Sequence, residues 1–180
     1  MNIIIVGCGK VGSNLAERLT AEGHDLVMVD ISAKKVEEVS NRFDTMGIVG
    51  NGASFAIQQE AGVEKADLFI AVTTSDELNL LCCLMAKKSG CATIARVRNP
   101  MYSQEIGFIR EQLGISMIIN PELTAAREIA KLLKFPSAIK IDTFAKGRVE
   151  LLRFRLKPEI GFGGKTIMEV MARLKTDVLI

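Results

Sequence analysis

Over the first 134 residues, six short apolar segments alternate with longer segments of helical pattern, and this alternation constrains the fold more than any other feature. Several of the apolar segments lack a strict polar–apolar alternation, as expected for strands that are buried on both faces. The predicted strands are residues 2–6, 25–30, 45–49, 67–73, 93–98 and 116–119. Because strands joined through helices form right-handed crossovers, the sequence predicts an α/β fold with a doubly wound, parallel, six-stranded sheet.

Residues with a preference for helix starts mark where several of the predicted helices begin. Thr74 is predicted to cap a helix over residues 75–88, and Glu77 would complete a capping box with it. Asn99-Pro100 and Asn120-Pro121 each combine a good N-cap residue with a proline at the first helical position. We therefore expect one helix to begin at each of these three places.

The loop after the first predicted strand has the sequence Gly7-Cys8-Gly9-Lys10-Val11-Gly12, which matches the G-x-G-x-x-G motif. In this motif Gly7 permits a tight turn, Gly9 lets the backbone approach a pyrophosphate, and Gly12 lets the helix pack close to the strand. The free N–H groups at the start of the following helix attract phosphate. Because the motif follows a β-branched strand and opens a helix, we expect a Rossmann nucleotide site. The alternative is a tight turn that binds no ligand.

Asp30 ends the second predicted strand, at the position where a carboxylate binds the ribose hydroxyls of adenosine. A carboxylate there repels a 2′-phosphate, so the sequence favours NAD or adenosine nucleotides over NADP. Within the glycine loop, Cys8 is expected to fill space rather than to act as a nucleophile. Lys10 is expected to contact a phosphate or the solvent.

Further candidates follow the third, fourth and fifth predicted strands, at the edge of the sheet where ligands bind in such folds. The small residues Gly50-Asn51-Gly52-Ala53 would leave space for an adenine. Thr73 and Thr74 offer hydroxyl and backbone groups. Arg98 could reach a phosphate or a ribose; the alternative is an ion pair between Arg98 and Glu122.

The chain has few candidates for an acid–base group beside a bound nicotinamide, which a dehydrogenase requires. Its single histidine, His24, precedes the second predicted strand and therefore lies at the opposite edge of the sheet. Its single tyrosine, Tyr102, lies inside a predicted helix, where packing is the simpler role. We therefore expect a nucleotide-binding protein without catalytic activity. The alternative is a fragment of an NAD-dependent oxidoreductase whose catalytic domain lies beyond Ile180.

The composition favours a cytoplasmic protein that does not bind nucleic acid. No apolar run approaches the roughly 18 residues needed to span a bilayer, and the first residues do not resemble a signal peptide. The four cysteines lack zinc-ligand spacing, so we expect reduced thiols and no metal site. With no tryptophan and one tyrosine, the chain has no aromatic residues interleaved with basic ones, as nucleic-acid stacking would require.

The pattern changes after residue 134. Residues 138–144 and 149–156 are predicted to form a hairpin with Ala145-Lys146-Gly147 in its turn, and residues 166–174 a short helix. Two strands and one helix are too few to close a core. Residues 131–180 are also basic, with 11 Lys and Arg against 5 Asp and Glu. The simpler interpretation is a solvated face; the alternatives are a face toward an acidic partner, an anionic ligand or nucleic acid. We therefore expect residues 135–180 to be the start of a small α+β subdomain, truncated or packed on another chain.

Five segments of the chain carry a family resemblance: residues 3–12 (IIIVGCGKVG), Val29-Asp30, Gly50-Asn51-Gly52, residues 67–79 (DLFIAVTTSDELN) and Ala95-Arg96-Val97-Arg98. Together they resemble the TrkA family, the regulatory subunits of Trk potassium uptake, which are built from RCK (regulator of potassium conductance, or KTN) domains. The stretch AVTTSDELN is much more specific than the glycine motif. The resemblance covers residues 1–134 closely, and residues 135–180 resemble the beginning of the family's smaller C-terminal subdomain.

The resemblance implies an RCK N-terminal domain that binds NAD(H) or adenine nucleotides such as ATP and ADP and has no catalytic activity. It also implies a homodimer or larger ring, peripheral at the inner face of the cell membrane, that regulates a membrane potassium transporter subunit. Helix Pro121–Lys134 would be the crossover helix between dimer partners. Complete family members often carry two such units in tandem, whereas this chain carries one. The motif and the resemblance together place nucleotide-binding residues at Gly7, Cys8, Gly9, Lys10, Val11, Gly12, Asp30, Gly52, Ala53, Thr73, Thr74 and Arg98.

Overall fold

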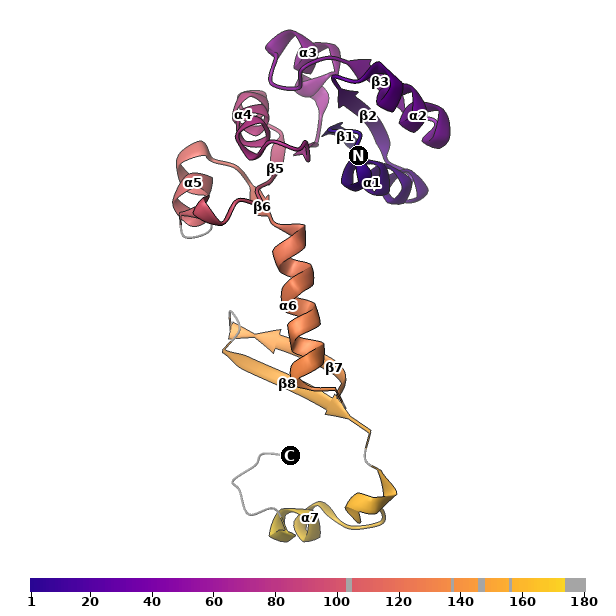
Figure 1. The fold of residues 1–180 in the computed structure, drawn as a ribbon, viewed down its shortest axis with the longest axis vertical. Coiled ribbons are helices and arrows are strands. Elements are labelled where there is room, and N and C mark those ends of the chain that lie inside the picture. Colours follow the sequence, from indigo (N-terminus) through magenta and orange to yellow (C-terminus); the bar gives the residue numbers. More distant parts are fainter. Residues whose placement is uncertain (103–104, 137, 146–147, 156, 174–180) are drawn as a thin grey trace. The chain divides into compact units, whose positions relative to one another are not determined.

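A parallel sheet of six strands, in the order β3-β2-β1-β4-β5-β6, organises the first part of the chain (Figure 1). This topology confirms the predicted six-stranded Rossmann sheet. The computed structural model describes residues 1–102, 105–136, 138–145, 148–155 and 157–173, which form two units, Met1–Thr124 and Ala125–Ile180. The strands of the sheet are β1 (Asn2–Val6), β2 (Asp25–Asp30), β3 (Met46–Val49), β4 (Leu68–Ala71), β5 (Ala92–Arg96) and β6 (Met117–Ile119).

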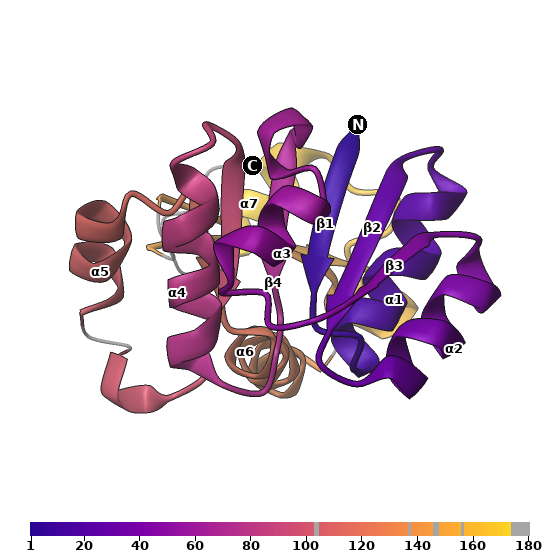
Figure 2. The same cartoon turned by 90° about the horizontal axis from the view of Figure 1, so that it is seen from above.

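Helices cover both faces of this sheet, which explains why its strands lack polar alternation (Figure 2). Successive side chains of a strand point to opposite faces. Accordingly, Ile3 and Ile5 of β1 pack in the layer of α1 and α2, whereas Ile4 and Val6 pack in the layer of α4. All four side chains are at most 2% exposed. The helices of this unit are α1 (Lys10–Ala21), α2 (Ala33–Phe43), α3 (Phe55–Glu60), α4 (Asp76–Lys87) and α5 (Ile106–Leu113), with 3₁₀ turns η1 (Val63–Lys65) and η2 (Pro100–Tyr102).

Strands β4 and β5 end two residues earlier than predicted. Their backbone pairing with each other stops at Ala71 and Ala95, while β5 pairs with β6 as far as Arg96. Beyond that point the Thr73 amide donates to the Asn79 side chain (2.8 Å), and the Arg98 amide donates to the Asp76 carboxylate (2.8 Å). Because these amides bond to side chains of α4 instead of to a neighbouring strand, the chain leaves the sheet and forms the loops of the carboxyl edge.

The predicted N-cap of α4 was wrong by one residue. Ser75, rather than Thr74, has the extended backbone conformation of a cap, and its Oγ accepts from the Leu78 amide (3.1 Å). Thr74 lies one position farther from the helix and lines a cavity described below. The Ser75 hydroxyl donates to the Glu77 carboxylate (3.0 Å), so Glu77 binds the cap residue's side chain rather than completing the predicted capping box.

Of the two Asn-Pro pairs, only the second begins a helix as predicted. The Asn120 side chain accepts from the Leu123 amide (2.9 Å) and caps α6 (Pro121–Lys134). The Asn99 side chain instead accepts from the Met101 amide two residues on (3.0 Å), which closes a short Asx turn at the start of η2. Helix α5 therefore begins only at Ile106.

The second unit contains an antiparallel hairpin of β7 (Ala138–Phe144) and β8 (Val149–Phe154), as predicted, followed by η4 (Pro158–Ile160) and α7 (Ile167–Arg173). The predicted turn residues 146 and 147, and the predicted ends at residues 156 and 174, lie outside the described residues. Several large apolar side chains are exposed here, among them Ile139 and Leu151 at 59% each. Within the described part of the chain, no helix combines the length and the apolar character needed to cross a membrane.

Candidate functional site

A cavity of about 600 Å³ opens at the carboxyl edge of the sheet, where the strand order reverses between β1 and β4. Ligands of doubly wound folds bind at such a switch point. Eight of the twelve predicted site residues line the cavity: Gly7, Gly9, Lys10, Val11, Asp30, Gly52, Thr73 and Thr74. The other four, Cys8, Gly12, Ala53 and Arg98, lie outside its lining. The sheet edge thus brings together predicted residues from the ends of four strands, β1, β2, β3 and β4.

The glycine loop has the geometry that the motif requires. Gly7 has φ +109°, a conformation that favours glycine, and its amide donates to the Val29 carbonyl (2.7 Å). A Cβ at Gly12 would lie 1.8 Å from the Gly7 carbonyl oxygen, so the helix can approach the loop only because Gly12 has no side chain. A Cβ at Gly9 would meet no protein atom within 4 Å. Gly12 therefore shapes the loop, whereas Gly9 leaves space beside the cavity.

The start of α1 lines the cavity through Lys10 and Val11 and supplies backbone N–H donors. The Ser13 amide makes the first intrahelical bond, to the Gly9 carbonyl (2.9 Å), so the amides before it are free of helical partners. The first turn of α1 contains no acidic residue to offset the positive end of the helix dipole. This end of the cavity is therefore suited to a phosphate group.

Asp30 joins the end of β2 to the glycine loop. Its Oδ2 accepts from the Cys8 amide (2.8 Å) and its Oδ1 from the Ser32 amide (2.9 Å). Each carboxylate oxygen can accept a further bond, so these contacts leave Asp30 capacity for a ligand hydroxyl. Burial, and then the charge of Asp30, raise the pKa of the Cys8 thiol to about 12. Cys8 is therefore a thiol at neutral pH, in keeping with the space-filling role predicted for it.

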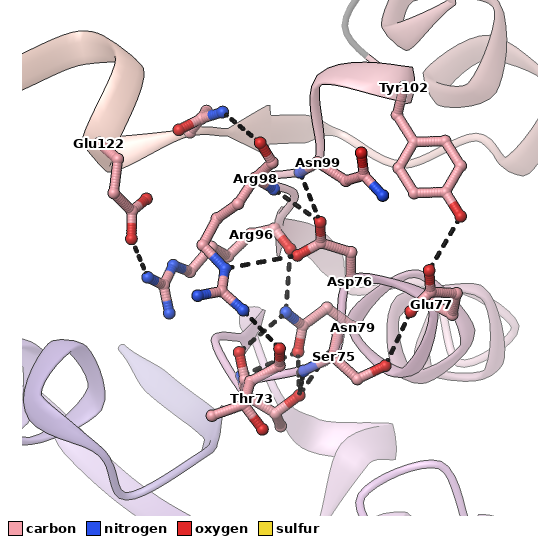
Figure 3. Close-up of polar contacts among 12 residues, drawn as sticks. Thr73, Ser75, Asp76, Glu77, Asn79, Arg96, Arg98, Asn99, Tyr102 and Glu122 are labelled. Carbon is pink, nitrogen blue, oxygen red and sulfur yellow. Dashed lines mark hydrogen bonds and ion pairs between the residues drawn. The ribbon is translucent and has the colours of Figure 1, made fainter. Parts of the chain in front are cut away.

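Sequence reasoning missed Arg96, the arginine that lines the cavity. Its guanidinium pairs with the Glu122 carboxylate at the start of α6, and both residues line the cavity (Figure 3). Arg98, which was expected to reach the ligand, has its Nε 3.7 Å from Asp76 Oδ1 and donates to the Thr74 carbonyl. The alternative ion pair of Arg98 with Glu122 does not form, because Glu122 pairs with Arg96. Arg96 was missed because β5 ends there, two residues before its predicted end.

The charges around the cavity are mixed, with an excess of cations. Lys10, Lys35 and Arg96 carry positive charge, and Asp30 and Glu122 carry negative charge. Burial alone would raise the pKa of Glu122, but hydrogen bonds from its own backbone and from Arg96, with the charge of the arginines, hold that pKa below its ordinary value. Glu122 is therefore ionised at neutral pH, and the cavity can attract an anion through cations that are only partly neutralised.

The single histidine and the single tyrosine lie away from this cavity, whereas Lys10, which lines it, is the residue expected to contact a phosphate or the solvent. His24 lines a second cavity of about 440 Å³ at the opposite, amino edge of the sheet, as its position in the sequence predicted. Its Nε2 is 3.7 Å from the Glu22 carboxylate. The Tyr102 hydroxyl donates to the Glu77 carboxylate (2.9 Å), outside the cavity lining. All four cysteines are free and buried, and the described residues contain no group of three metal-ligating side chains.

The sheet order, the glycine loop and the cavity at the switch point define the first unit as a Rossmann-type domain. The chain belongs to the TrkA-N domain family, whose sequence profile matches residues 3–121. A Trk system potassium uptake protein TrkA homolog from Archaeoglobus fulgidus is 39% identical over an alignment of 171 residues that covers 94% of this chain and 39% of that protein. The chain therefore spans about two fifths of the length of this relative.

Solved structures agree with this assignment. The TrkA-N domain of inner membrane protein ybaL from Escherichia coli matches with a TM-score of 0.65 and 29% identity, over 73% of this chain and 96% of that chain. The GsuK channel bound to NAD matches with a TM-score of 0.64 and 20% identity, over 96% of this chain and 30% of that chain. GsuK bound to ADP matches with a TM-score of 0.55 and 20% identity, over 66% of this chain and 31% of that chain. At this identity the likeness to GsuK establishes the fold alone.

Proposed function

We propose that this chain is the NAD(H)- or adenine-nucleotide-binding part of a cytoplasmic regulatory subunit that gates a membrane potassium transporter. The observation that carries the proposal is the cavity at the switch point, with free α1 amides at one end and the Asp30 carboxylate at β2. The free amides of α1 suit a phosphate group, and the Asp30 carboxylate suits the hydroxyls of a ribose. The names of the relatives support the transport role, and GsuK has been solved with NAD and with ADP.

The proposed nucleotide would contact the predicted residues that line the cavity, together with Arg96. A phosphate beside Arg96 would compete with Glu122 for the guanidinium, because both are anions. Glu122 lies in the first turn of α6, and α6 continues the chain into the second unit. Ligand binding could therefore change the position of α6. We propose residues 135–180 as the start of the C-terminal RCK subdomain, which α6 connects to the nucleotide domain.

A ligand can shift such an assembly between two shapes only if it binds one of them better. Coupling between two sites is typically about 1–3 kcal/mol, so adding nucleotide should change potassium flux by severalfold to roughly a hundredfold. The test reconstitutes the full-length protein with its membrane transporter and compares potassium uptake with and without NADH, NAD, ATP and ADP. NADH itself should not be consumed. A rate of potassium uptake that no nucleotide changes, combined with steady NADH oxidation by a small carbonyl substrate, would favour an oxidoreductase instead.

We also expect the chain to associate into a homodimer or a larger ring. On α6, Ile129, Leu132 and Leu133 form an apolar stripe and are 58%, 62% and 75% exposed. A second copy is the simplest cover for this stripe, most often with twofold symmetry. Multi-angle light scattering at micromolar concentration should show at least a dimer. Replacing Leu132 and Leu133 with lysine should shift the population toward a 19.6 kDa monomer. A wild-type chain that is already a clean monomer would contradict this expectation.

A further inference from the structure

Two walls of the candidate nucleotide cavity are held together by one buried side chain that does not line the cavity. Thr73, after β4, and Arg96, at the end of β5, both line it. Asn79 lies behind them on the first turns of α4 and is 0% exposed (Figure 3). A polar residue buried so completely must satisfy its hydrogen-bonding groups within the protein.

All of the hydrogen-bonding capacity of Asn79 is used on these two walls. Its Oδ1 accepts from the Thr73 amide (2.8 Å) and from the Thr73 hydroxyl (2.7 Å). Its Nδ2 donates to the Thr73 carbonyl (3.3 Å) and to the Arg96 carbonyl (2.9 Å). A primary amide offers two acceptor sites and two donor hydrogens, so these four bonds account for the whole group. Among side chains of this size, only asparagine makes this set of contacts.

The hydrogen bonds of Asn79 connect the ends of β4 and β5 at the point where the two strands no longer pair with each other. Backbone pairing between β4 and β5 ends at Ala71 and Ala95, so the ladder does not fix the distance from Thr73 to Arg96. Asp76, one helical turn before Asn79, holds the chain after β5 by accepting from the Arg98 amide (2.8 Å) and the Asn99 amide (2.7 Å). The start of α4 therefore replaces the missing ladder between the two strands.

We propose that Asn79 is a positioning residue of the nucleotide site: it fixes Arg96 relative to the Thr73 wall and thereby sets nucleotide affinity without touching the nucleotide. The proposal rests on the proposed nucleotide-binding function. Three contacts position Arg96: strand pairing with Ile119 of β6 on one side, the Asn79 amide on the β4 side, and the pairing of its guanidinium with Glu122. Without Asn79 the Arg96 carbonyl loses its donor, and the strand end can move away from the cavity.

The test compares Asn79→Asp and Asn79→Leu with Thr93→Val in the 180-residue chain. Asn79→Asp keeps the acceptor and removes the donor to Arg96, whereas Asn79→Leu keeps only the approximate volume. Thr93 is also 0% exposed, and its hydroxyl accepts from the Ser116 amide at the other end of β5. Calorimetry with NADH and with ADP at 10 °C should show affinity at least about tenfold weaker for both Asn79 variants. The Thr93 variant should lose stability but keep its affinity.

A double-mutant cycle with Arg96→Ala separates positioning from a general structural role. If Asn79 acts through Arg96, Asn79→Asp should cost affinity about threefold or less once the arginine side chain is absent. An equal loss in both backgrounds would overturn the proposal, as would Asn79 variants that melt earlier with unchanged Kd. Failure of both Asn79 variants to fold would also overturn it, because the role would then be global stability. A wild-type chain that binds neither NADH nor ADP would instead refute the proposed function itself.

Discussion

Gly12→Ala should destabilise the protein strongly, although the same change in an ordinary helix interior stabilises by about 0.5–1 kcal/mol. The added Cβ would lie 1.8 Å from the Gly7 carbonyl oxygen. That oxygen belongs to a loop fixed by the positive φ of Gly7 and by the hydrogen bond that the Gly7 amide donates to the Val29 carbonyl. The clash is therefore with backbone, and no flexible side chain can move aside. We expect the free energy of unfolding to fall by about 3 kcal/mol and NADH binding to be lost.

The matched control for this prediction is Gly9→Ala, three residues earlier in the same glycine motif. Gly9 has φ −77°, which alanine adopts freely, and no protein atom lies within 4 Å of the added Cβ. This variant should unfold within about 1 kcal/mol of the wild type yet bind NADH at least about tenfold more weakly, because the methyl group keeps a pyrophosphate from the backbone. Urea unfolding and calorimetry measure both quantities. Two glycine variants with identical stability would contradict the structural argument.

The fold could be predicted from the sequence because the local pattern of each strand agrees with its place in a sheet covered on both faces. Apolar runs such as Ile3–Val6 have no polar face, so they predict strands covered on both sides, and the observed layers bury them in this way. The glycine motif located the site for a similar reason. Gly7 and Gly12 are required by backbone geometry that lies within a few residues of the motif itself.

The rest of the site depends on contacts between residues distant in the sequence. The end of β5 at Arg96 is set by Asn79 and Asp76 of α4, about 20 positions away, and no local pattern shows that these side chains replace the strand ladder. Prediction therefore extended β5 by two residues and chose Arg98 over Arg96. The prediction of the α4 cap was wrong for the same reason. Thr73 and Thr74 line the cavity, and the helix begins only after Ser75.

Asp30→Ala should weaken the binding of both NADH and ADP by about a hundredfold. Hydrogen bonds from ribose hydroxyls to a charged acceptor contribute roughly 1.5–3 kcal/mol. The same carboxylate also holds the Cys8 and Ser32 amides, so its removal loosens the loop that approaches the phosphates. Calorimetry on the purified variant measures the effect. Unchanged dissociation constants for NADH and ADP alike would refute the site assignment.

Asp25→Ala is the matched control, because Asp25 is an exposed carboxylate at the opposite end of the same strand. It should leave nucleotide affinity unchanged, which separates the local role of Asp30 from its contribution to net charge.

The wild-type chain should also bind NADPH more weakly than NADH, since the Asp30 carboxylate repels a 2′-phosphate. In Asp30→Ala that difference should narrow, because the repulsion is gone and Lys35, which also lines the cavity, can attract the phosphate. An NADPH preference that is the same in both proteins would mean that the ribose does not lie at Asp30.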